Sequence, residues 1–223
     1  MVKNPDILSA DELFNDLSSK FIEDKDLLEK AYNFASDGHM NQKRASGEPY
    51  ITHPLQVALY LSDLSMDLET IIAAILHDLI EDTDITYKNI KKEFGSDVAN
   101  IVDGVTKLDR IQYNSNEEAK AEAIRKMVIA MSKDIRVLIL KLADRLHNIQ
   151  TIKYLADYKQ ERIANETLYV YAPLAHRLGL QNIKHILEDV SSGLLHKNQN
   201  MEIESLIEKS APNREKNIKK SVK

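Results

Sequence analysis

Apolar residues recur every three to four positions along most of the chain. This spacing places them on one face of an α-helix, where they can pack against a core. No run alternates apolar and polar residues in the way that predicts a β-strand. The pattern predicts an all-α fold, and the predicted helices cover residues 10–35 (a pair of helices), 54–64, 67–82, 87–94, 97–108, 117–131, 134–155, 160–178 and 181–195.

Prolines and a capping residue mark where several of these helices begin or break. Pro54 suits the first turn of a helix, because that turn needs no amide donor at its position. Asp67 can accept a hydrogen bond from the first turn of the helix that follows it. Pro173 lies inside the apolar pattern over 160–178, where its missing N–H should bend or interrupt the helix.

The ends of the pattern suggest a single folded domain. Residues 109–116 lack the helical spacing and are predicted to form a loop. Beyond Lys197 the sequence becomes polar and basic, and we expect it to be flexible. We therefore predict one helical domain over 1–196 and a polar tail over 197–223. A chain of 223 residues is long enough for such a domain to bury a sizeable core.

Composition and charge argue against several classes of function. The formal net charge is −5, whereas a nucleic-acid-binding protein usually carries a basic excess or stripe. The chain has no cysteine, which removes disulfides, thiolate metal sites and cysteine nucleophiles. The N-terminus lacks a signal pattern, and no apolar run is long enough to span a bilayer. We therefore expect a cytoplasmic protein with no nucleic-acid or membrane partner.

Candidate chemistry begins with the octapeptide ILHDLIED at residues 75–82, which carries one histidine and three acids without a lysine or arginine. On a helix, residues four apart lie on the same face, so His77 lies over Glu81 and Asp78 over Asp82. Crowded carboxylates repel one another unless a cation binds them. Imidazole nitrogen and carboxylate oxygen together suit Mn, Fe or Zn. A solvated helix end is the alternative interpretation of the same residues.

A second predicted helix, DIRVLILKLADRLHNIQTI at residues 134–152, carries a polar stripe on an otherwise apolar surface. The stripe consists of Lys141, Asp144, Arg145, Asn148 and Thr151. A buried acid needs a partner. Asp144 could form an ion pair with a cation of its own stripe, Lys141 or Arg145. It could instead face the ILHDLIED residues as a metal ligand from a neighbouring helix, joined by His53 in YITHP.

Five elements of the sequence, taken in order, carry a family resemblance: RASGEPYITHP, LHDLIEDT, VDGVTKL, KLADRLHN and ETLYVYAPLAHRLGL. They closely resemble the hydrolase domain of the RelA/SpoT family, whose members belong to the HD superfamily and remove the 3′-pyrophosphate from the alarmones ppGpp and pppGpp. The resemblance runs from about Phe34 to Asp189. It implies a compact HD-domain fold of about eight to eleven helices.

The resemblance also implies an activity and the residues that carry it. The activity is that of a guanosine-3′,5′-bis(diphosphate) 3′-diphosphatase, which releases pyrophosphate from ppGpp or pppGpp and thereby controls alarmone levels in the stringent response. The implied ligands of one Mn²⁺ ion are His53, His77, Asp78 and Asp144. The implied catalytic acids beside the metal are Glu81 and Asp82. The implied nucleotide contacts are Arg44, Ser46, Asn148 and Thr151, with Lys107 as a further phosphate contact.

The chain departs from the family pattern close to the expected substrate contacts. It has Asn41 where family members commonly have glycine, and Ala45 where they commonly have a basic residue. The missing cation at Ala45 bears on phosphate affinity and substrate choice, and Lys43 is a possible compensation. The four implied ligands and both acids are present, so we expect an active hydrolase.

The remaining histidines are assigned structural roles. His147 and His176 are predicted to pack between helices or to support a ligand, and His39 to hydrogen-bond the nearby loop. His185 and His196 are predicted to lie on the surface.

Two other functions stay open at this point. One is hydrolysis of a different nucleotide by an HD phosphohydrolase, and the other is a module that binds alarmone or metal without turnover. The chain is too short to include a synthetase domain, so we expect either a stand-alone small alarmone hydrolase or the hydrolase fragment of a longer enzyme. The oligomeric state is left open.

Overall fold

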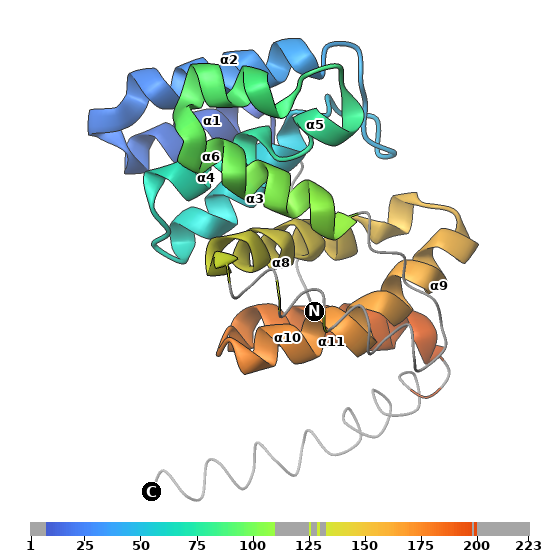
Figure 1. The fold of residues 1–223 in the computed structure, drawn as a ribbon. Helices are drawn as coiled ribbons and strands as arrows, with labels where there is room; N and C mark the ends of the chain where they lie inside the picture. Colours follow the sequence, from blue (N-terminus) through green and yellow to red (C-terminus); the bar gives the residue numbers. More distant parts are fainter. Residues whose placement is uncertain (1–7, 110–124, 126–128, 130–132, 198, 200–223) are drawn as a thin grey trace, which may run out of the picture. The chain divides into compact units, whose positions relative to one another are not determined.

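The computed structural model describes residues 8–109, 125, 129, 133–197 and 199. These residues are helical or irregular and contain no strand, apart from an isolated β-bridge between Lys43 and Pro49. The all-α prediction is therefore confirmed. The chain divides into two compact units, Met1–Leu155 and Ala156–Lys223, whose described helices are labelled in Figure 1. None of the described helices is long and apolar enough to cross a membrane.

The first unit contains the predicted chemistry and most of the helices. Its α-helices are α1 (Ala10–Lys20), α2 (Lys25–Gly38), α3 (Thr52–Asp63), α4 (Leu68–Leu76), α5 (Leu79–Asp82), α6 (Tyr87–Asp109) and α8 (Ile135–Gln150). Two short 3₁₀ segments, Ile22–Asp24 and Ile152–Tyr154, follow α1 and α8. The predictions over 109–116 and 117–131 fall almost wholly outside the described residues. The other predicted helices of this unit are present, but the one over 67–82 is broken and the one over 134–155 ends as an α-helix at Gln150.

Side-chain caps explain where several helices begin. The Ser9 hydroxyl accepts the Glu12 N–H while the Glu12 carboxylate accepts the Ser9 N–H, which forms a capping box at α1. The Asp67 carboxylate accepts the N–H of Thr70 at 2.8 Å, so the predicted cap of α4 is confirmed. Pro54 lies in the first turn of α3, as predicted.

The helices that carry the predicted ligands lie at the centre of the first unit. Helix α3 packs against α1, α4 and α8, and α4 also packs against α6. The facing side chains Leu55, Leu61, Ile71, Ile75 and Leu138 are fully buried. The polar stripe of α8 is drawn into this core, because α8 is buried over most of its surface. Its charged side chains are therefore held where water cannot solvate them.

The helix predicted over 67–82 is broken at the histidine–aspartate pair. Helix α4 ends at Leu76, and His77 and Asp78 form a turn before the short helix α5. Asp78 has φ −87° and ψ −8°, close to the bridge region, which interrupts the helical hydrogen-bond ladder. The prediction of one continuous helix is therefore wrong at this point. The apolar residues keep their helical spacing across the turn, so the sequence pattern gives no sign of the break.

Helix α6 combines two predicted helices. The helices predicted over 87–94 and 97–108 are both present, separated at Gly95, whose φ of 90° and ψ of 172° are not helical. Such a positive φ is readily adopted only by glycine.

The second unit consists of helices that turn back on one another. They are α9 (Asp157–Glu166), a π-helical turn (Thr167–Tyr171), α10 (Ala172–Arg177) and α11 (Gln181–Leu195). Pro173 lies in the first turn of α10, immediately after the π-helical turn, so the predicted interruption is confirmed. Of the predicted tail over 197–223, only Lys197 and Gln199 are described.

The start of α8 is tied to two other helices by one guanidinium group. Arg136 donates two hydrogen bonds of 3.0 Å to the Asp97 carboxylate on α6 and one of 3.1 Å to Asp67 at the start of α4. It also donates to Asp134, the N-cap of α8, and this contact lowers the pKa of the Asp134 carboxyl. The network joins the starts of α4 and α8 to the part of α6 that follows Gly95.

We predict that Arg136→Met lowers the free energy of unfolding by about 1–2 kcal/mol at neutral pH, because the network is charged but partly exposed. The pKa of Asp134 lies below its unfolded value, so the stabilisation is complete above about pH 4 and is lost as the pH falls through the lower, folded value. Urea unfolding of both proteins at pH 7 and at about pH 3 measures this. If the difference in free energy of unfolding between the two proteins is the same at both pH values, the ion-pair explanation is wrong.

A close approach between α6 and α8 depends on Gly104. A Cβ atom at this position would lie 2.7 Å from Cγ2 and 3.1 Å from Cγ1 of Val137, closer than packed carbon atoms tolerate. Val137 is buried on α8, so it has little room to move.

We predict that Gly104→Ala lowers the free energy of unfolding by about 1–2 kcal/mol, although alanine favours an isolated helix by about 1 kcal/mol. Adding Val137→Ala should relieve the overlap and give a favourable coupling of more than about 1 kcal/mol in a double-mutant cycle. Urea denaturation of the four proteins provides the values. Additive effects of the two substitutions would show that the helices do not touch here.

Candidate metal and nucleotide site

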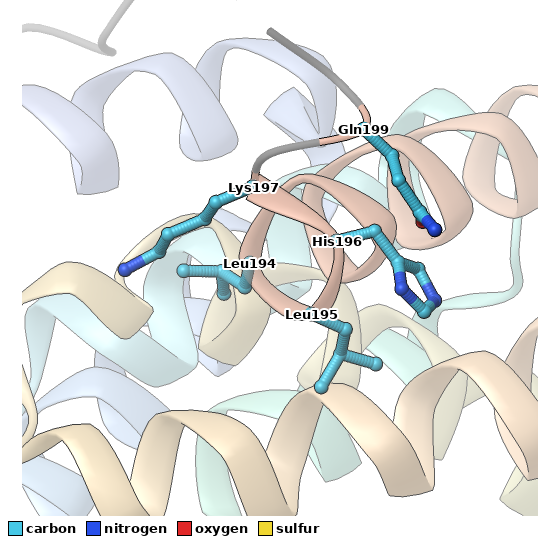
Figure 2. A pocket seen from close by; sticks show the side chains of 5 residues that line it. All are labelled: Leu194, Leu195, His196, Lys197 and Gln199. Atoms are coloured by element: carbon cyan, nitrogen blue, oxygen red, sulfur yellow. The ribbon is translucent and has the colours of Figure 1, made fainter. Parts of the chain in front are cut away.

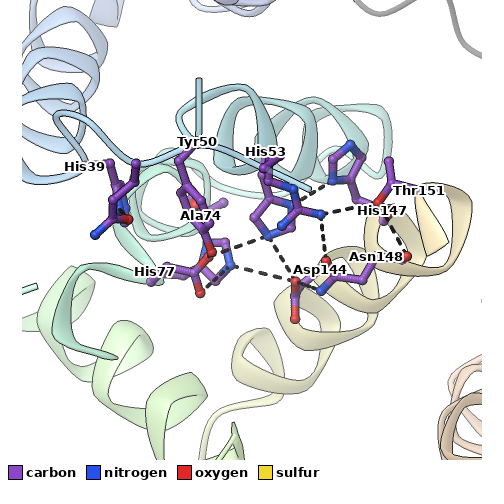
Figure 3. Close-up of polar contacts among 12 residues, drawn as sticks. His39, Tyr50, His53, Ala74, His77, Asp144, His147, Asn148 and Thr151 are labelled. Atoms are coloured by element: carbon purple, nitrogen blue, oxygen red, sulfur yellow. Dashed lines mark hydrogen bonds and ion pairs between the residues drawn. The ribbon is translucent and has the colours of Figure 1, made fainter. Parts of the chain in front are cut away.

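The four predicted ligands converge inside the first unit. His53 lies in the first turn of α3, His77 and Asp78 in the turn after α4, and Asp144 on α8. His53 Nε2 lies 3.1 Å from Asp144 Oδ1 and 3.6 Å from Asp78 Oδ2, while His77 Nε2 lies 3.1 Å from Asp78 Oδ1 and 3.9 Å from Asp144 Oδ1. Figure 3 shows His53, His77 and Asp144 facing one another.

These separations have the size expected of atoms that share one ion. Two ligand atoms bonded at about 2.1 Å and at right angles lie about 3.0 Å apart. Ligand atoms of His53, His77 and Asp144 all lie within 4.8 Å of one another, and the three side chains are buried. Asp78 reaches the same histidine nitrogens from the turn. His53, His77 and Asp144 therefore fit a single cation with two nitrogen ligands and one oxygen ligand. Asp78 turns a different oxygen to each histidine and is not part of this three-residue group.

The buried lone pair of His77 is the clearest indication of a cation. Its Nδ1 lies 2.8 Å from the carbonyl oxygen of Ala74, which can only accept, so Nδ1 carries the proton. Nε2 is buried and has no hydrogen-bond partner among the described residues, although it lies 3.1 Å from Asp78 Oδ1. In the neutral ring this nitrogen presents a lone pair. A lone pair beside the Asp78 and Asp144 oxygens is repelled by them unless a cation lies between.

The electrostatics of the cluster keep its carboxylates charged. Burial tends to raise the pKa of Asp78, but the neighbouring His77 and His53 outweigh it and leave the pKa lowered. Burial likewise tends to lower the pKa of His77, but the charges of Asp78 and Asp144 leave it raised. For His53 burial prevails, and its pKa is lowered. The raised pKa of His77 shows that these carboxylates stabilise a positive charge beside Nε2, which a divalent metal can supply in place of a proton.

Asp144 accepts a hydrogen bond from a lysine of its own helix and also lies beside the histidines. Lys141 Nζ donates to Asp144 Oδ2 at 2.5 Å, which leaves Oδ1 toward His53. Burial tends to raise the pKa of Asp144, but the Lys141 ammonium and His53 hold it well below its usual range. The two sequence interpretations of Asp144 therefore do not exclude each other, because a carboxylate has two oxygens.

Tyr50 is a site residue that the sequence analysis missed. Its hydroxyl donates a hydrogen bond of 2.7 Å to Asp78 Oδ2. Burial and the Asp78 charge raise the pKa of the phenol, so it remains a neutral donor. The only signal available in the sequence was its position three residues before His53 in YITHP.

Three of the predicted nucleotide contacts meet beside the metal cluster. Arg44 Nη2 donates to Asn148 Oδ1 at 3.0 Å and to Thr151 Oγ1 at 3.3 Å, across more than 100 positions of sequence. Asn148 Nδ2 also donates to Asp144 Oδ1 at 2.6 Å (Figure 3), which links the Arg44 cluster to the proposed ligands. A cation next to this site suits an anionic phosphate group.

The loop that carries Arg44 explains one departure from the family pattern. The Arg44 N–H donates to the Glu48 carbonyl at 3.0 Å, and the Gly47 N–H donates to the Arg44 carbonyl at 2.9 Å. Asn41, at the start of this loop, has φ 72°. Asparagine is among the few residues other than glycine that adopt this left-handed region, so Asn41 can replace glycine and keep the turn.

Two predicted phosphate contacts are not joined to this cluster by any hydrogen bond within the described part of the chain. Ser46 lies on the same loop as Arg44 and is half-buried. Lys107 is largely exposed on α6 and forms an ion pair with Asp103, one turn earlier. Their roles stay predictions.

The predicted catalytic acids border a cavity whose lining includes none of the four predicted ligands. Glu81 and Asp82, on α5, are exposed and line a cavity of about 580 Å³ together with Gly38, Gln42, Thr83, Asp84 and Ile85. The Gln42 side chain donates to the Asp82 carbonyl at 3.0 Å and so connects α5 to the loop of Arg44. A volume of this size is typical of pockets that hold a small ligand.

A second cavity, of about 480 Å³, lies at the end of α11 (Figure 2). Its lining residues are Leu194, Leu195, His196, Lys197 and Gln199. They include no carboxylate, so this cavity does not offer the mixed nitrogen and oxygen ligands of the first unit.

The other histidines divide into buried and exposed groups. His39 is buried and bonds Gln42 Oε1 through Nδ1 at 2.9 Å, which confirms the predicted contact with the loop. His147 is buried, and its Nδ1 lies 2.6 Å from His53 Nδ1. His185 and His196 are exposed as predicted. The packing role predicted for His176 is wrong, because it lies on the exposed face of α10.

Comparison with known proteins places the chain in a family. The HD domain family matches residues 31–181. The chain is 50% identical over 188 residues to a GTP pyrophosphokinase of Streptomyces coelicolor, and 48% identical over 193 residues to the bifunctional (p)ppGpp synthase/hydrolase SpoT of Escherichia coli. It is 45% identical over 215 residues to a guanosine-3′,5′-bis(diphosphate) 3′-pyrophosphohydrolase of Aquifex aeolicus.

These matches cover 84%, 86% and 96% of this chain but only 22%, 28% and 30% of the relatives, so the chain spans about a quarter of their length. A solved structure described as a metazoan ortholog of SpoT that hydrolyses ppGpp is 25% identical, with a TM-score of 0.50. That match covers 81% of this chain and 96% of the other. The RelA/SpoT resemblance is thereby confirmed, and the chain belongs to the HD domain family.

Proposed function

We propose that this chain is a metal-dependent hydrolase that cleaves the 3′-pyrophosphate from ppGpp and pppGpp, leaving GDP or GTP. The observation that carries the proposal is the buried His77 Nε2, which has no hydrogen-bond partner among the described residues and lies beside the Asp78 and Asp144 oxygens and the Arg44 cluster. The printed names of the Escherichia coli and Aquifex relatives and of the metazoan structure support the choice of substrate. The substrate is a cytosolic nucleotide, and we propose a cytoplasmic location.

In this proposal His53, His77, Asp78 and Asp144 hold one divalent ion. Their two nitrogens and two carboxylates suit Mn, Fe or Zn, and the family resemblance selects Mn²⁺. Such an ion supplies Lewis acidity toward the phosphate and lowers the pKa of the attacking water. Lys141 and Tyr50 keep Asp144 and Asp78 oriented through the hydrogen bonds described above.

The chain's own groups then manage charge and protons around the reaction. The oxygen of water attacks the nearer phosphorus of the 3′-pyrophosphate, and the bond from that phosphorus to the 3′-oxygen breaks. Glu81 or Asp82, on the wall of the cavity, takes a proton from the water, and the same acid or its neighbour donates a proton to the 3′-oxygen. Arg44 offsets the charge of the pyrophosphate, with Asn148 and Thr151 orienting its guanidinium.

We predict that Asp78→Asn lowers Mn²⁺ affinity and ppGpp hydrolysis by about 100-fold or more, because the amide keeps the shape of the side chain but not its charge. Asp16→Asn, on the exposed face of α1, is the matched control and should keep both properties. Metal binding by calorimetry and release of GDP and pyrophosphate with and without Mn²⁺ provide the readouts. If the unaltered protein releases no pyrophosphate with any divalent metal, the proposed reaction is wrong.

We predict a different result for the acids at the cavity. Glu81→Gln and Asp82→Asn should bind Mn²⁺ within about threefold of the unaltered protein, while at least one of them loses about 10²–10⁴-fold in turnover, the range for a lost acid or base. Asp84→Asn, on the rim of the same cavity, serves as the control. Metal affinity and steady-state rates are measured on each variant. Unimpaired turnover in both Glu81→Gln and Asp82→Asn would remove these acids from the mechanism.

A further inference from the structure

The two proposed histidine ligands are held in different ways at Nδ1. His77 Nδ1 meets the Ala74 carbonyl, which can only accept, so the backbone fixes its tautomer. His53 Nδ1 instead meets the Nδ1 of His147 at 2.6 Å. The two rings stack with centroids 4.9 Å apart and an interplanar angle of 30° (Figure 3). An imidazole nitrogen can donate or accept, so this contact does not by itself fix which ring carries the proton.

A separation of 2.6 Å between two ring nitrogens requires a single proton between them. With no proton the two lone pairs would repel, and with two the N–H groups would collide. Both rings are buried, with 1% exposure for His53 and 8% for His147. The rings therefore have two neutral arrangements, in which either His53 donates to His147 or His147 donates to His53.

The other face of His53 decides between these arrangements once a metal binds. His53 Nε2 points to Asp144 Oδ1 and Asp78 Oδ2, so this nitrogen is the one that can ligate a metal in the proposed site. A ligating nitrogen must present a lone pair, and a neutral ring then carries its proton on Nδ1. Only an acceptor at His147 Nδ1 can receive that proton.

We propose, on the basis of the proposed metal site, that His147 is a positioning residue: its Nδ1 accepts the His53 Nδ1 proton and holds His53 in the tautomer that binds the metal. His147 then carries its own proton on Nε2. It thus plays for His53 the part that the Ala74 carbonyl plays for His77.

Removal of the metal by chelation should reverse the shared hydrogen bond. His53 Nε2 lies 3.1 Å from Asp144 Oδ1, which favours a proton on Nε2 when no metal occupies it. His53 Nδ1 then accepts from His147 Nδ1. Each ring carries one proton in both arrangements: His53 exchanges Nε2–H for Nδ1–H on metal binding, and His147 exchanges Nδ1–H for Nε2–H. Metal binding thereby changes the tautomer of both rings with no net gain or loss of protons by the pair.

The surrounding groups leave His147 available for this role. The hydroxyl of Tyr60, whose ring lies 6.4 Å from the His147 ring, donates to Gln150 Oε1. Arg44, the nearby cation, donates to Asn148 and Thr151. The one hydrogen bond that the structure shows for His147 Nδ1 is the contact with His53.

The decisive measurement is made on the unaltered protein loaded with diamagnetic Zn²⁺ in place of Mn²⁺. Long-range ¹H–¹⁵N spectra of ¹⁵N-histidine-labelled protein report which ring nitrogens carry protons. We expect His53 protonated on Nδ1 and His147 on Nε2 with Zn²⁺, and the opposite pair of tautomers after chelation. A proton on His147 Nδ1 in the Zn²⁺-loaded protein would overturn the proposal without touching the proposed function.

Variants supply an independent test through metal affinity. His147→Phe keeps a ring but removes the acceptor, and we expect it to weaken Mn²⁺ binding by about 10-fold or more. His147→Asn places an amide oxygen near the position of Nδ1 and should restore affinity to within about threefold. His185→Phe, on the exposed face of α11, is the control and should bind as the unaltered protein does.

The outcomes separate this inference from the proposed function. Normal metal affinity in His147→Phe would overturn the positioning role while the metal site stands. Failure of the unaltered protein to bind any divalent metal would overturn both. If His147→Phe does not fold, the tautomers observed in the unaltered protein decide the question alone.

Discussion

The structure depends on two carboxylates and a buried histidine nitrogen meeting inside a helical core. The pKa values of Asp78 and Asp144 are lowered, and His77 Nε2 lies beside their oxygens while His77 Nδ1 meets the Ala74 carbonyl. Lys141 offsets one of these charges, and Tyr50 gives Asp78 only a neutral donor. An uncompensated charge inside a protein costs several kcal/mol. The cluster is therefore expected to favour a bound cation over any rearrangement of its own side chains.

The helices of the first unit make that cluster possible by bringing distant segments together. The first turn of α3, the break after α4 and the middle of α8 each present a ligand to the same small volume. Buried leucine and isoleucine side chains hold these segments with little freedom. The loop of Arg44 then places a guanidinium beside the cluster, and α5 borders the cavity with two acids. Separate elements thus carry the candidate ligands, the Arg44 guanidinium and the two acids of α5.

The two histidines of the cluster show two solutions to the same problem. A metal ligand must keep its proton on the nitrogen that faces away from the ion. For His77 a backbone carbonyl ensures this, and no substitution can remove it. For His53 a side chain is in contact, so the arrangement depends on a second residue and can change. The backbone thus fixes the tautomer of His77, whereas the tautomer of His53 depends on which nitrogen of His147 carries a proton.

The sequence alone determined the candidate metal ligands, the helix caps and the helix-interrupting prolines, because each depends on residue type and on spacing along the chain. Helical periodicity placed Lys141, Asp144 and Asn148 on one stripe. The predicted cap begins a helix and Pro173 interrupts one, because both effects depend only on neighbouring residues. Contacts between helices were decided only by the tertiary structure. The stacking of His147 on His53 spans 94 positions, and no periodicity within a helix encodes it. The break at His77 and Asp78 was likewise invisible, since the apolar pattern continues through a turn of two residues. Covalent geometry sets neighbours within a helix, whereas packing of the whole core sets neighbours between helices.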